Sequence, residues 1–401
     1  MRIDLVEYGT PAFALLSAEQ VVGLRGTGLV EVGPSDVVGE YELRPQGKVG
    51  AIACGTVEVR VAPKVAIDRL VFLLGYSARA VNWQDNDVAV DPDADSVHVI
   101  SEAFARTLTR AVRPGLLQGY RVAEEALPVV RGRIRIDEQL KRRPGQWLPV
   151  EVAYDDFSID IAENQILKAA LDRLVRNPLV GTGVRRQLAA LATRFAEVSR
   201  LVPGAPLPAW QPSRLNARYD GPLRLAELIL ASTSFEHRVG AVRIDGFVLD
   251  MPRIFEDFVT TAMREALQAL VPGTAVEGQY PTWLDTGSAI PMTPDIVWLD
   301  SREAPLAVLD AKYKAEKPSG FPNADIYQAH AYATALALPD AHLVYAKGNE
   351  SVQSFEIRES GVVVHAHVLD LSAPPEALLA QVDVLAVKVA EGSSVGALVL
   401  A

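Results

Sequence analysis

Two short stretches, Thr293-Pro294-Asp295-Ile296-Val297 and Val308-Leu309-Asp310-Ala311-Lys312-Tyr313, decide the fold of the carboxy-terminal third of this sequence. Apolar runs flank the polar segment 300–305, which is typical of a turn between two strands. If the hairpin is symmetric about this turn, Asp300 pairs with Pro305 and Asp295 pairs with Asp310. Directly opposed residues share one face of a sheet, and the two-residue period of a strand places Lys312 on the same face.

The two opposed carboxylates predict a metal site. Like charges at paired positions destabilise a plain hairpin, whereas a divalent cation between them reverses the sign of the interaction. Mg²⁺ prefers oxygen ligands and binds through one or two carboxylates plus substrate phosphate. It lowers the pKa of a bound water and stabilises charge that develops at phosphorus. We therefore predict phosphodiester hydrolysis, with Asp295 and Asp310 as metal ligands and Lys312 as the residue that positions the water.

Two further segments supply candidate site residues. Gln328 and Tyr332 are spaced i and i+4 on an expected helix, so they share a face and are candidates for contacting DNA phosphate or bracing the metal site. Glu256, on an earlier expected helix, is a candidate third carboxylate. Its neighbour Asp257 is expected to face solvent.

A purely structural explanation stays open for these residues. Asp295 would then only begin a strand after a proline, and Asp310 and Lys312 would form an ordinary surface ion pair, since a D-x-K triplet recurs by chance in long chains. The helix that carries Gln328 would be half-exposed, with Tyr327 in the core.

The composition is that of an ordinary folded protein. Of the 401 residues, 49% are hydrophobic and 22% charged, which makes long disordered stretches unexpected. The first residues lack the apolar region of a signal peptide, and no apolar run approaches the roughly 20 residues of a membrane span. The single cysteine, Cys54, excludes an internal disulfide and is expected to be a buried small residue. We expect a cytoplasmic protein with no membrane contact.

The charge is unevenly distributed. The net charge is −11, but residues 106–218 hold 19 Lys and Arg against 11 Asp and Glu, a local excess of +8. A basic middle flanked by acidic ends is typical either of a positive face toward DNA or an acidic partner, or of the solvated surface of several helices. Both explanations stay open.

The order of expected elements indicates an α/β (α+β) multidomain protein. Residues 1–115 begin β-rich, with alternating segments such as Val57–Val61, and form an expected partner-binding domain. Residues 116–239 form a basic region of strands and helices, in which 131–136 is expected to be a basic strand. Residues 240–401 show a helix, three strands, a helix and further strands, a compact α/β layout. The boundary near residue 240 is set to within about ten residues.

Several motifs point to a known family. The carboxy-terminal third resembles the PD-(D/E)xK nucleases, a restriction-endonuclease-like domain, and the pair Gln328 and Tyr332 is similar to the extra motif of the RecB-like branch. Motifs spread over nearly the whole chain resemble, in the same order, those of the McrC family. They are Val61-Ala-Pro-Lys64, Gly75-Tyr76, Arg131-Gly-Arg133-Ile, Ile161-Ala-Glu-Asn164-Gln-Ile-Leu-Lys168, Ile254-Phe255-Glu256-Asp257-Phe258-Val259 and Asp310-Ala-Lys312-Tyr313.

McrC is the nuclease subunit of McrBC, a modification-dependent bacterial restriction and antiviral defence system. The resemblance implies a Mg²⁺-dependent DNA endonuclease, with Mn²⁺ as an alternative ion. It also implies a McrB-like AAA+ GTPase hexamer as partner, which recognises DNA with modified bases and whose nucleotide hydrolysis the amino-terminal part of McrC stimulates. The chain has no P-loop of its own, because Gln46-Gly47-Lys48-Val49 lacks the required spacing and hydroxyl. Arg131, Arg133 and Arg135 are candidates to reach into the partner ring, without a catalytic role.

Two other functions stay open. One is a non-catalytic activator or adaptor that docks onto an AAA+ partner, and the other is a stand-alone RecB-like exonuclease. A zinc hydrolase is disfavoured, because none of the six histidines forms H-E-x-x-H or pairs with cysteines. No G-x-S-x-G motif or credible cysteine nucleophile is present. The acidic net charge leaves open how much DNA affinity resides in this chain.

Overall fold

The structure is a computed structural model. It describes residues 1–77, 96–202, 205–211, 213–231, 233–239, 242–315, 321–347 and 353–393. The chain forms two compact units: residues 1–99 together with 232–401, and residues 100–231. These units do not coincide with the three expected segments 1–115, 116–239 and 240–401, whose roles as separate functional domains stay a prediction.

A five-stranded sheet joins the two chain segments of the first unit. Its strands, in the order β1-β6-β5-β11-β10, are β1 (Arg2–Val6), β6 (Val57–Ala62), β5 (Lys48–Cys54), β11 (Val242–Asp250) and β10 (Thr233–Val239). The alternating segment Val57–Val61 forms β6 as expected, with its valines buried. The boundary expected near residue 240 falls inside the β10–β11 hairpin, and β11 pairs antiparallel with β5.

A smaller sheet and a helix also belong to the amino-terminal segment. The sheet has the order β2-β4-β3, with β2 (Ala12–Leu15), β4 (Glu40–Pro45) and β3 (Val30–Pro34). Helix α1 (Ala18–Thr27) interrupts the region expected to be β-rich. Its start is a capping box: the Ser17 side chain accepts from the Gln20 backbone N–H, and the Gln20 side chain accepts from the Ser17 backbone N–H. This S-x-x-Q pattern is a helix-start signal that the sequence contains.

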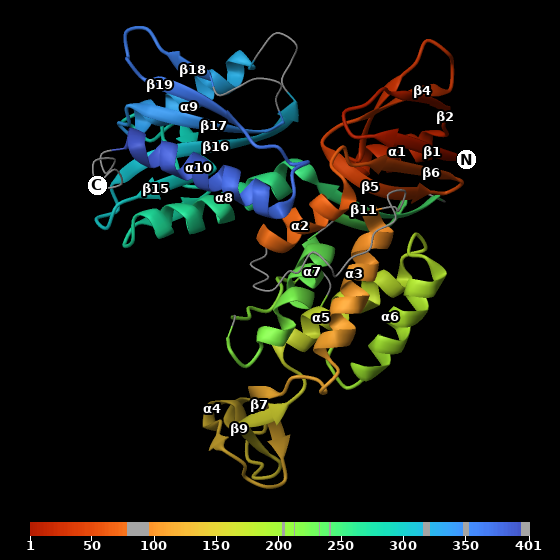
Figure 1. The fold of residues 1–401 in the computed structure, drawn as a ribbon. Helices are drawn as coiled ribbons and strands as arrows, with labels where there is room; N and C mark the ends of the chain where they lie inside the picture. The colour runs from red at the N-terminus through yellow and green to blue at the C-terminus, as the bar shows by residue number, and fades with distance from the viewer. Residues whose placement is uncertain are drawn as a thin grey trace. The chain divides into compact units, whose positions relative to one another are not determined.

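A six-stranded sheet forms the carboxy-terminal part of the first unit (Figure 1). Its order is β12-β15-β16-β17-β19-β18, with β12 (Ala275–Gly278), β15 (Ile296–Leu299), β16 (Pro305–Ala315), β17 (Asp340–Lys347), β19 (Val363–Val368) and β18 (Gln353–Glu356). The helices of this part are α2 (Ile67–Ser77), α8 (Met251–Leu270), α9 (Asn323–Ala335) and α10 (Pro375–Gly392). A small ribbon of β13 (Thr282–Trp283) and β14 (Pro291–Met292) lies between β12 and β15 in the sequence.

Buried side chains beneath α9 form the core that supports this sheet. Val297 of β15, Leu343 and Tyr345 of β17, and Ala329 and Tyr332 of α9 belong to one hydrophobic cluster. The purely structural alternative, which placed Tyr327 in the core, does not hold: Tyr327 is 69% exposed and Tyr332 is 5% exposed. On a helix these two residues are five positions apart and therefore point in different directions.

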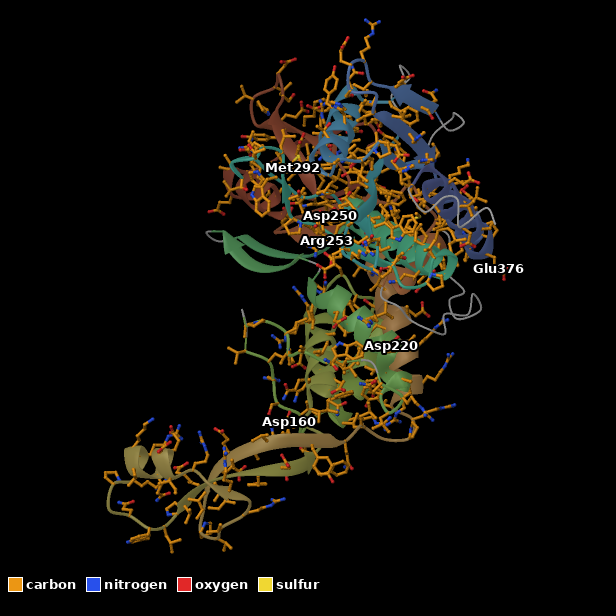
Figure 2. All side chains as sticks on the ribbon, turned by 90° about the vertical axis from the view of Figure 1, so that its left-hand side faces the viewer. Asp160, Asp220, Asp250, Arg253, Met292 and Glu376 are labelled. Carbon is orange, nitrogen blue, oxygen red and sulfur yellow. The ribbon has the colours of Figure 1, made fainter. Side chains whose placement is uncertain are left out.

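The second unit combines helices with a small sheet. Its helices are α3 (Ser96–Ala111), whose first residues lie in the first unit, α4 (Ile136–Arg142), α5 (Ala162–Arg176), α6 (Thr182–Arg194), the 3₁₀ helix Ala217–Tyr219 and α7 (Asp220–Ala231). Its sheet has the order β7-β9-β8, with β7 (Gly119–Leu127), β9 (Val150–Ser158) and β8 (Arg133–Ile134). Asp160 lies between β9 and α5, where the sheet meets the helices (Figure 2).

The strand expected over 131–136 is shorter than predicted. Only Arg133 and Ile134 form β8, and α4 begins at Ile136. Gly132 has a φ of +71°, and a Cβ atom there would lie 2.4 Å from the Ala153 backbone oxygen. The chain therefore turns sharply at Gly132, which explains the glycine of the Arg131-Gly-Arg133 motif and the short strand.

Two other motif residues are structural. Asn164 Nδ2 donates to the backbone oxygens of Leu117 (2.9 Å) and Ile159 (2.7 Å). Lys168 is 8% exposed, and its ammonium donates to the backbone oxygens of Phe195 and Val198 just beyond α6. These bonds satisfy carbonyl groups that a helix end leaves without partners. Among the helices that the structure describes, none combines the length and apolar character of a membrane span.

Candidate functional site

The hairpin of β15 and β16 has the register expected from the sequence over its first three pairs. Ile296 pairs with Leu309, Val297 with Val308 and Trp298 with Ala307. One step further in this register, Asp295 Oδ2 accepts a hydrogen bond from the Ala311 backbone N–H at 2.9 Å. Asp295 therefore lies beside Asp310 at the start of the hairpin.

The turn of the hairpin differs from the expected symmetric turn. A bulge after Trp298 shifts the register by one, so Leu299 pairs with Pro305. Asp300 N–H donates to the Ala304 oxygen at 2.9 Å instead of pairing with Pro305. The bulge lies at the far end of the strands from the two carboxylates, and their register is unaffected by it.

Asp310 and Lys312 are next neighbours on one face of β16. Asp310 is 2% exposed, and the Lys312 ammonium forms an ion pair with its Oδ2 atom. Apart from this contact with Lys312, Asp310 Oδ2 has no hydrogen-bond partner in the described part of the chain, and the atom is buried. A single ammonium group compensates the buried carboxylate, so a cation bound at the same oxygen would stabilise its charge further.

The acidic groups of the site raise one another's pKa. Burial and the neighbouring Asp295 raise the pKa of Asp310 to about 7. Burial and Glu256 raise the pKa of Asp295. Burial lowers the pKa of Lys312, but the nearby Asp310 and Asp295 outweigh this effect and raise it overall. The lysine therefore stays charged, while the carboxylates gain from any added positive charge.

A hydrogen-bonded chain connects Lys312 to α9. Lys312 Nζ donates to Gln328 Oε1 at 2.9 Å, and Gln328 Nε2 donates to the Tyr332 hydroxyl at 2.7 Å. The Tyr332 hydroxyl is 3.5 Å from the Thr293 backbone oxygen, two residues before Asp295. The structure thus brings Gln328 and Tyr332 into the site, where they hold the lysine head group.

Glu256 reaches the site through a residue that the sequence analysis did not single out. Glu256 is half-buried on α8, and Asp257 is exposed as expected. The Gln279 side-chain amide donates to Glu256 Oε1, and to Asp295 Oδ1 at 3.0 Å. Gln279 lies opposite Asp295, because its backbone N–H donates to the Asp295 oxygen at 2.9 Å. Pairing the strand near 275–284 with the one at 295–299 would have identified it, since Gly278 pairs with Ile296.

The donor set suits a hard cation bound by few protein ligands. Asp295 and Asp310 offer carboxylate oxygens, and Glu256 lies one amide away. Among the residues that the structure describes, no group of three or more His, Cys, Asp or Glu is placed to hold a metal ion. Mg²⁺ commonly binds through one or two carboxylates and completes its shell with water and substrate phosphate. The pair Asp295 and Asp310 fits this second kind of site.

The arginines expected to reach a partner belong to the second unit. Arg131 lies over the Tyr154 ring, with its guanidinium carbon 3.9 Å from the ring centroid. Arg135 forms an ion pair with Glu124 at 2.9 Å. Arg131, Gly132 and Arg133 line a surface pocket together with residues of β7 and β9.

The fold and the site define a mixed α/β protein with several sheets and a cluster of carboxylates and one lysine on its largest sheet. Residues 43–346 match the family described as McrBC 5-methylcytosine restriction system component. Since this match spans more than half of the sequence, the chain belongs to that family. The resemblance to McrC expected from the sequence is confirmed at this level. No curated protein matches the sequence.

Two solved structures resemble this chain to different degrees. One similar chain comes from the refined half-complex of a tetradecameric assembly of Thermococcus gammatolerans McrB AAA+ hexamers with bound McrC. That chain is 17% identical to this one, with a TM-score of 0.58, and the match covers 96% of this chain and 98% of that chain. A chain in the cryo-EM structure of the Thermococcus gammatolerans McrBC complex is 18% identical, with a TM-score of 0.40 over 67% of this chain and 88% of that one. The first match shows a common fold over nearly the full length of both chains.

Proposed function

We propose that this chain is the Mg²⁺-dependent DNA endonuclease subunit of a McrBC-like restriction system. It cuts DNA together with an AAA+ GTPase hexamer and stimulates the nucleotide hydrolysis of that partner. One observation carries the nuclease part of the proposal: the buried Asp310 carboxylate forms an ion pair with Lys312 and lies beside Asp295 on one sheet face. The membership in a family of restriction system components supports the substrate.

In the proposed reaction, water attacks the phosphorus of DNA and the bond to the leaving oxygen breaks. Asp295 and Asp310 would hold Mg²⁺, and the ion would lower the pKa of a bound water and neutralise charge at phosphorus. Lys312, held by Gln328, orients the attacking water and donates toward the phosphate. The Ala311 N–H fixes one oxygen of Asp295, so the carboxylate keeps its orientation as charge develops.

The partner part of the proposal rests on the second unit and on the comparison. The similar chain comes from an assembly of McrB AAA+ hexamers with bound McrC. In this chain, large exposed apolar side chains gather on the small sheet and α4. They are Tyr120, Val122, Val129, Val130, Ile134, Ile136, Leu140, Trp147, Leu148 and Phe157. Exposed apolar patches of this kind mark interaction sites, and Trp147 is 90% exposed. We propose that the AAA+ partner docks here, on residues 120–157, and not on the segment 1–115 that was expected from the sequence to bind it.

The nuclease proposal is tested with Asp310→Asn in the complex with the partner. Loss of metal charge stabilisation worth several kcal/mol lowers the cleavage rate at least about 100-fold. The control is Glu303→Gln, an exposed carboxylate on the turn of the same hairpin, which leaves cleavage unchanged. Both variants keep the stimulation of GTP hydrolysis. Cleavage of 5-methylcytosine DNA and nucleotide turnover are measured on the same samples.

The alternatives give different results in this experiment. A non-catalytic activator predicts that Asp310→Asn leaves DNA cleavage by the complex unchanged. A stand-alone exonuclease predicts that the purified chain degrades DNA ends with Mg²⁺ alone, without partner or nucleotide. Either result contradicts the proposal.

A further inference from the structure

Both strands of a β-ribbon start from the candidate site. We name residues 279–295 the site ribbon. Its backbone pairs Gln279 with Asp295 and Tyr280 with Pro294, through N–H to oxygen bonds of 2.9 and 3.0 Å. The same register continues through β13 and β14 to the tip, where the Leu284 N–H donates to the Ile290 oxygen at 2.9 Å. One pairing register therefore runs from Asp295 to the tip, with a bend at Gln279, whose φ is +51°.

The tip of the site ribbon is apolar and exposed. Trp283 is 48% exposed, Leu284 42% and Ile290 51%. Nearer the base, Tyr280 and Met292 pack against the core cluster beneath α9. The ribbon is thus anchored at its base and presents bulky apolar side chains to solvent at its end. Clustered apolar residues of this kind mark interaction sites, whereas apolar residues scattered singly over a surface do not.

The tip is also held in one conformation. The Asp285 carboxylate accepts backbone N–H groups from Gly287 (3.1 Å), Ala289 (2.9 Å) and Ile290 (2.8 Å). These bonds, that from Ile290 foremost, lower the pKa of Asp285, so the carboxylate stays charged and keeps its donors. Because the loop is ordered in advance, binding through the tip loses little conformational entropy.

We infer that the tip of the site ribbon, through Trp283, Leu284 and Ile290, inserts between base pairs of the DNA that the site cleaves. This inference rests on the proposed function. Trp283 is four positions after Gln279, which is opposite Asp295, and a strand rises about 3.3 Å per residue. The tip therefore lies at most about 13 Å from Gln279, a length of up to about four base pairs of B-form DNA at about 3.4 Å each.

The chemistry of the tip fits bases better than phosphates. Residues 282–292 include no Lys or Arg, so they cannot neutralise the DNA backbone. Apolar side chains inserted at a base step unstack it and kink the duplex, and a tryptophan stacks on any base. The same ribbon carries both Asp295 and the tip, which keeps the tip close to a duplex whose phosphate is at Asp295. The contact would bend the DNA over the site and favour cutting next to flexible pyrimidine–purine steps.

The test compares Trp283→Ala and Trp283→Phe in the complex with the partner and nucleotide. The matched control is Val384→Ala, an exposed apolar residue on α10. Duplexes carry 2-aminopurine at successive positions, and a rise in fluorescence marks the unstacked base. Trp283→Ala abolishes this rise and raises KM for DNA about tenfold, while kcat changes less than about twofold. Trp283→Phe retains most of both properties, and Ile290→Ala gives an intermediate loss.

Specific results overturn the inference. Unchanged KM and fluorescence in both Trp283→Ala and Ile290→Ala refute it. If Trp283→Ala instead weakens binding of the purified AAA+ partner with DNA parameters unchanged, the tip is a protein-docking surface. Absence of any DNA cleavage by the wild-type complex contradicts the proposed function itself. Intact cleavage with a silent Trp283→Ala contradicts only the ribbon's role.

Discussion

Replacing Glu7 by Gln should stabilise the protein above neutral pH, because Glu7 is a buried acid with too few donors. The residue follows β1 and is fully buried. Its Oε2 atom accepts from the Tyr313 hydroxyl at 3.1 Å and from the Lys64 backbone N–H at 3.2 Å. Its Oε1 atom has no hydrogen-bond partner in the described residues. Burial raises the pKa of Glu7 from 4.5 to about 7, although the two hydrogen bonds lower it.

The expected magnitude follows from this pKa. Below pH 4.5 the carboxyl group is protonated in both the folded and the unfolded state, and its ionisation costs nothing. As the pH rises from 4.5 to about 7, the unfolded chain loses the proton first, so stability falls. A shift of about 2.5 pH units corresponds to about 3 kcal/mol, fully expressed above pH 7. Gln has no such titration, so its stability relative to the wild type should rise by roughly 2 to 3 kcal/mol between pH 5 and pH 8, because part of the effect is already present at pH 5.

The assay is urea unfolding of wild type and Glu7→Gln at pH 5, 6, 7 and 8. Glu303→Gln, which removes an exposed carboxylate, is the control and should follow the wild type within about 0.5 kcal/mol at each pH. Only the change of the difference with pH is diagnostic, because the buried amide adds a cost that does not depend on pH. A difference between Glu7→Gln and wild type that stays constant from pH 5 to pH 8 would show that Glu7 is not a buried, strained carboxyl group, and the reasoning would be wrong.

Three further predictions concern the metal site and the second unit. Mg²⁺ at ten times its dissociation constant should stabilise the wild type by about 1.4 kcal/mol and should not stabilise Asp310→Asn. In EDTA at pH 8 the variant should be more stable than the wild type, because the pKa of Asp310 is raised to about 7. Equal shifts of the melting temperature in both proteins would contradict this prediction. Gly132→Ala should destabilise the small sheet by at least about 2 kcal/mol, because an added Cβ atom would lie 2.4 Å from the Ala153 oxygen. The stimulation of GTP hydrolysis by the variant should also fall. Hydrogen exchange of β8 and β9 at the wild-type rate would contradict the predicted loss of stability. Lys168→Met should lower the free energy of unfolding by about 3 kcal/mol, because it leaves the carbonyl groups after α6 without their charged donor. Urea unfolding of the full chain measures this loss, and an unchanged midpoint would refute the capping role of Lys168.

The site was predictable where its geometry depends on neighbours along the chain. The register of β15 and β16 follows from two apolar runs and a short polar segment, and the observed pairs agree with it up to the bulge. The spacing of Gln328 and Tyr332 likewise predicted a shared helix face, and their side chains are hydrogen-bonded. The sequence did not predict which residue this helix face contacts, because the hydrogen bond from Lys312 to Gln328 depends on how α9 packs against the sheet.

Contacts between distant segments were not predictable in the same way. Gln279 escaped notice because no local pattern marks it, and its role depends on β12 pairing with β15. The histidines show the same limit. His342 and His367 were unremarkable in the sequence, yet parallel pairing of β17 with β19 brings their ring nitrogens to 3.1 Å in the buried interior. Parallel neighbours are joined by long crossover connections, so strand spacing in the sequence does not reveal them.

The sequence by itself determined the hairpin, the identity of the two acids and the lysine on one face, the paired residues of α9 and the family. The hairpin, the shared face and the helix pair follow from strand and helix periods and from short turns, which act over a few residues. The family follows from the resemblance of motifs spread along the chain. Only the tertiary structure decided that β11 completes the amino-terminal sheet, that Gln279 links Glu256 to Asp295, and that Glu7 receives the hydroxyl of Tyr313. Those contacts join residues separated by up to 306 positions, and their formation depends on burial of apolar surface over the whole unit rather than on any local pattern.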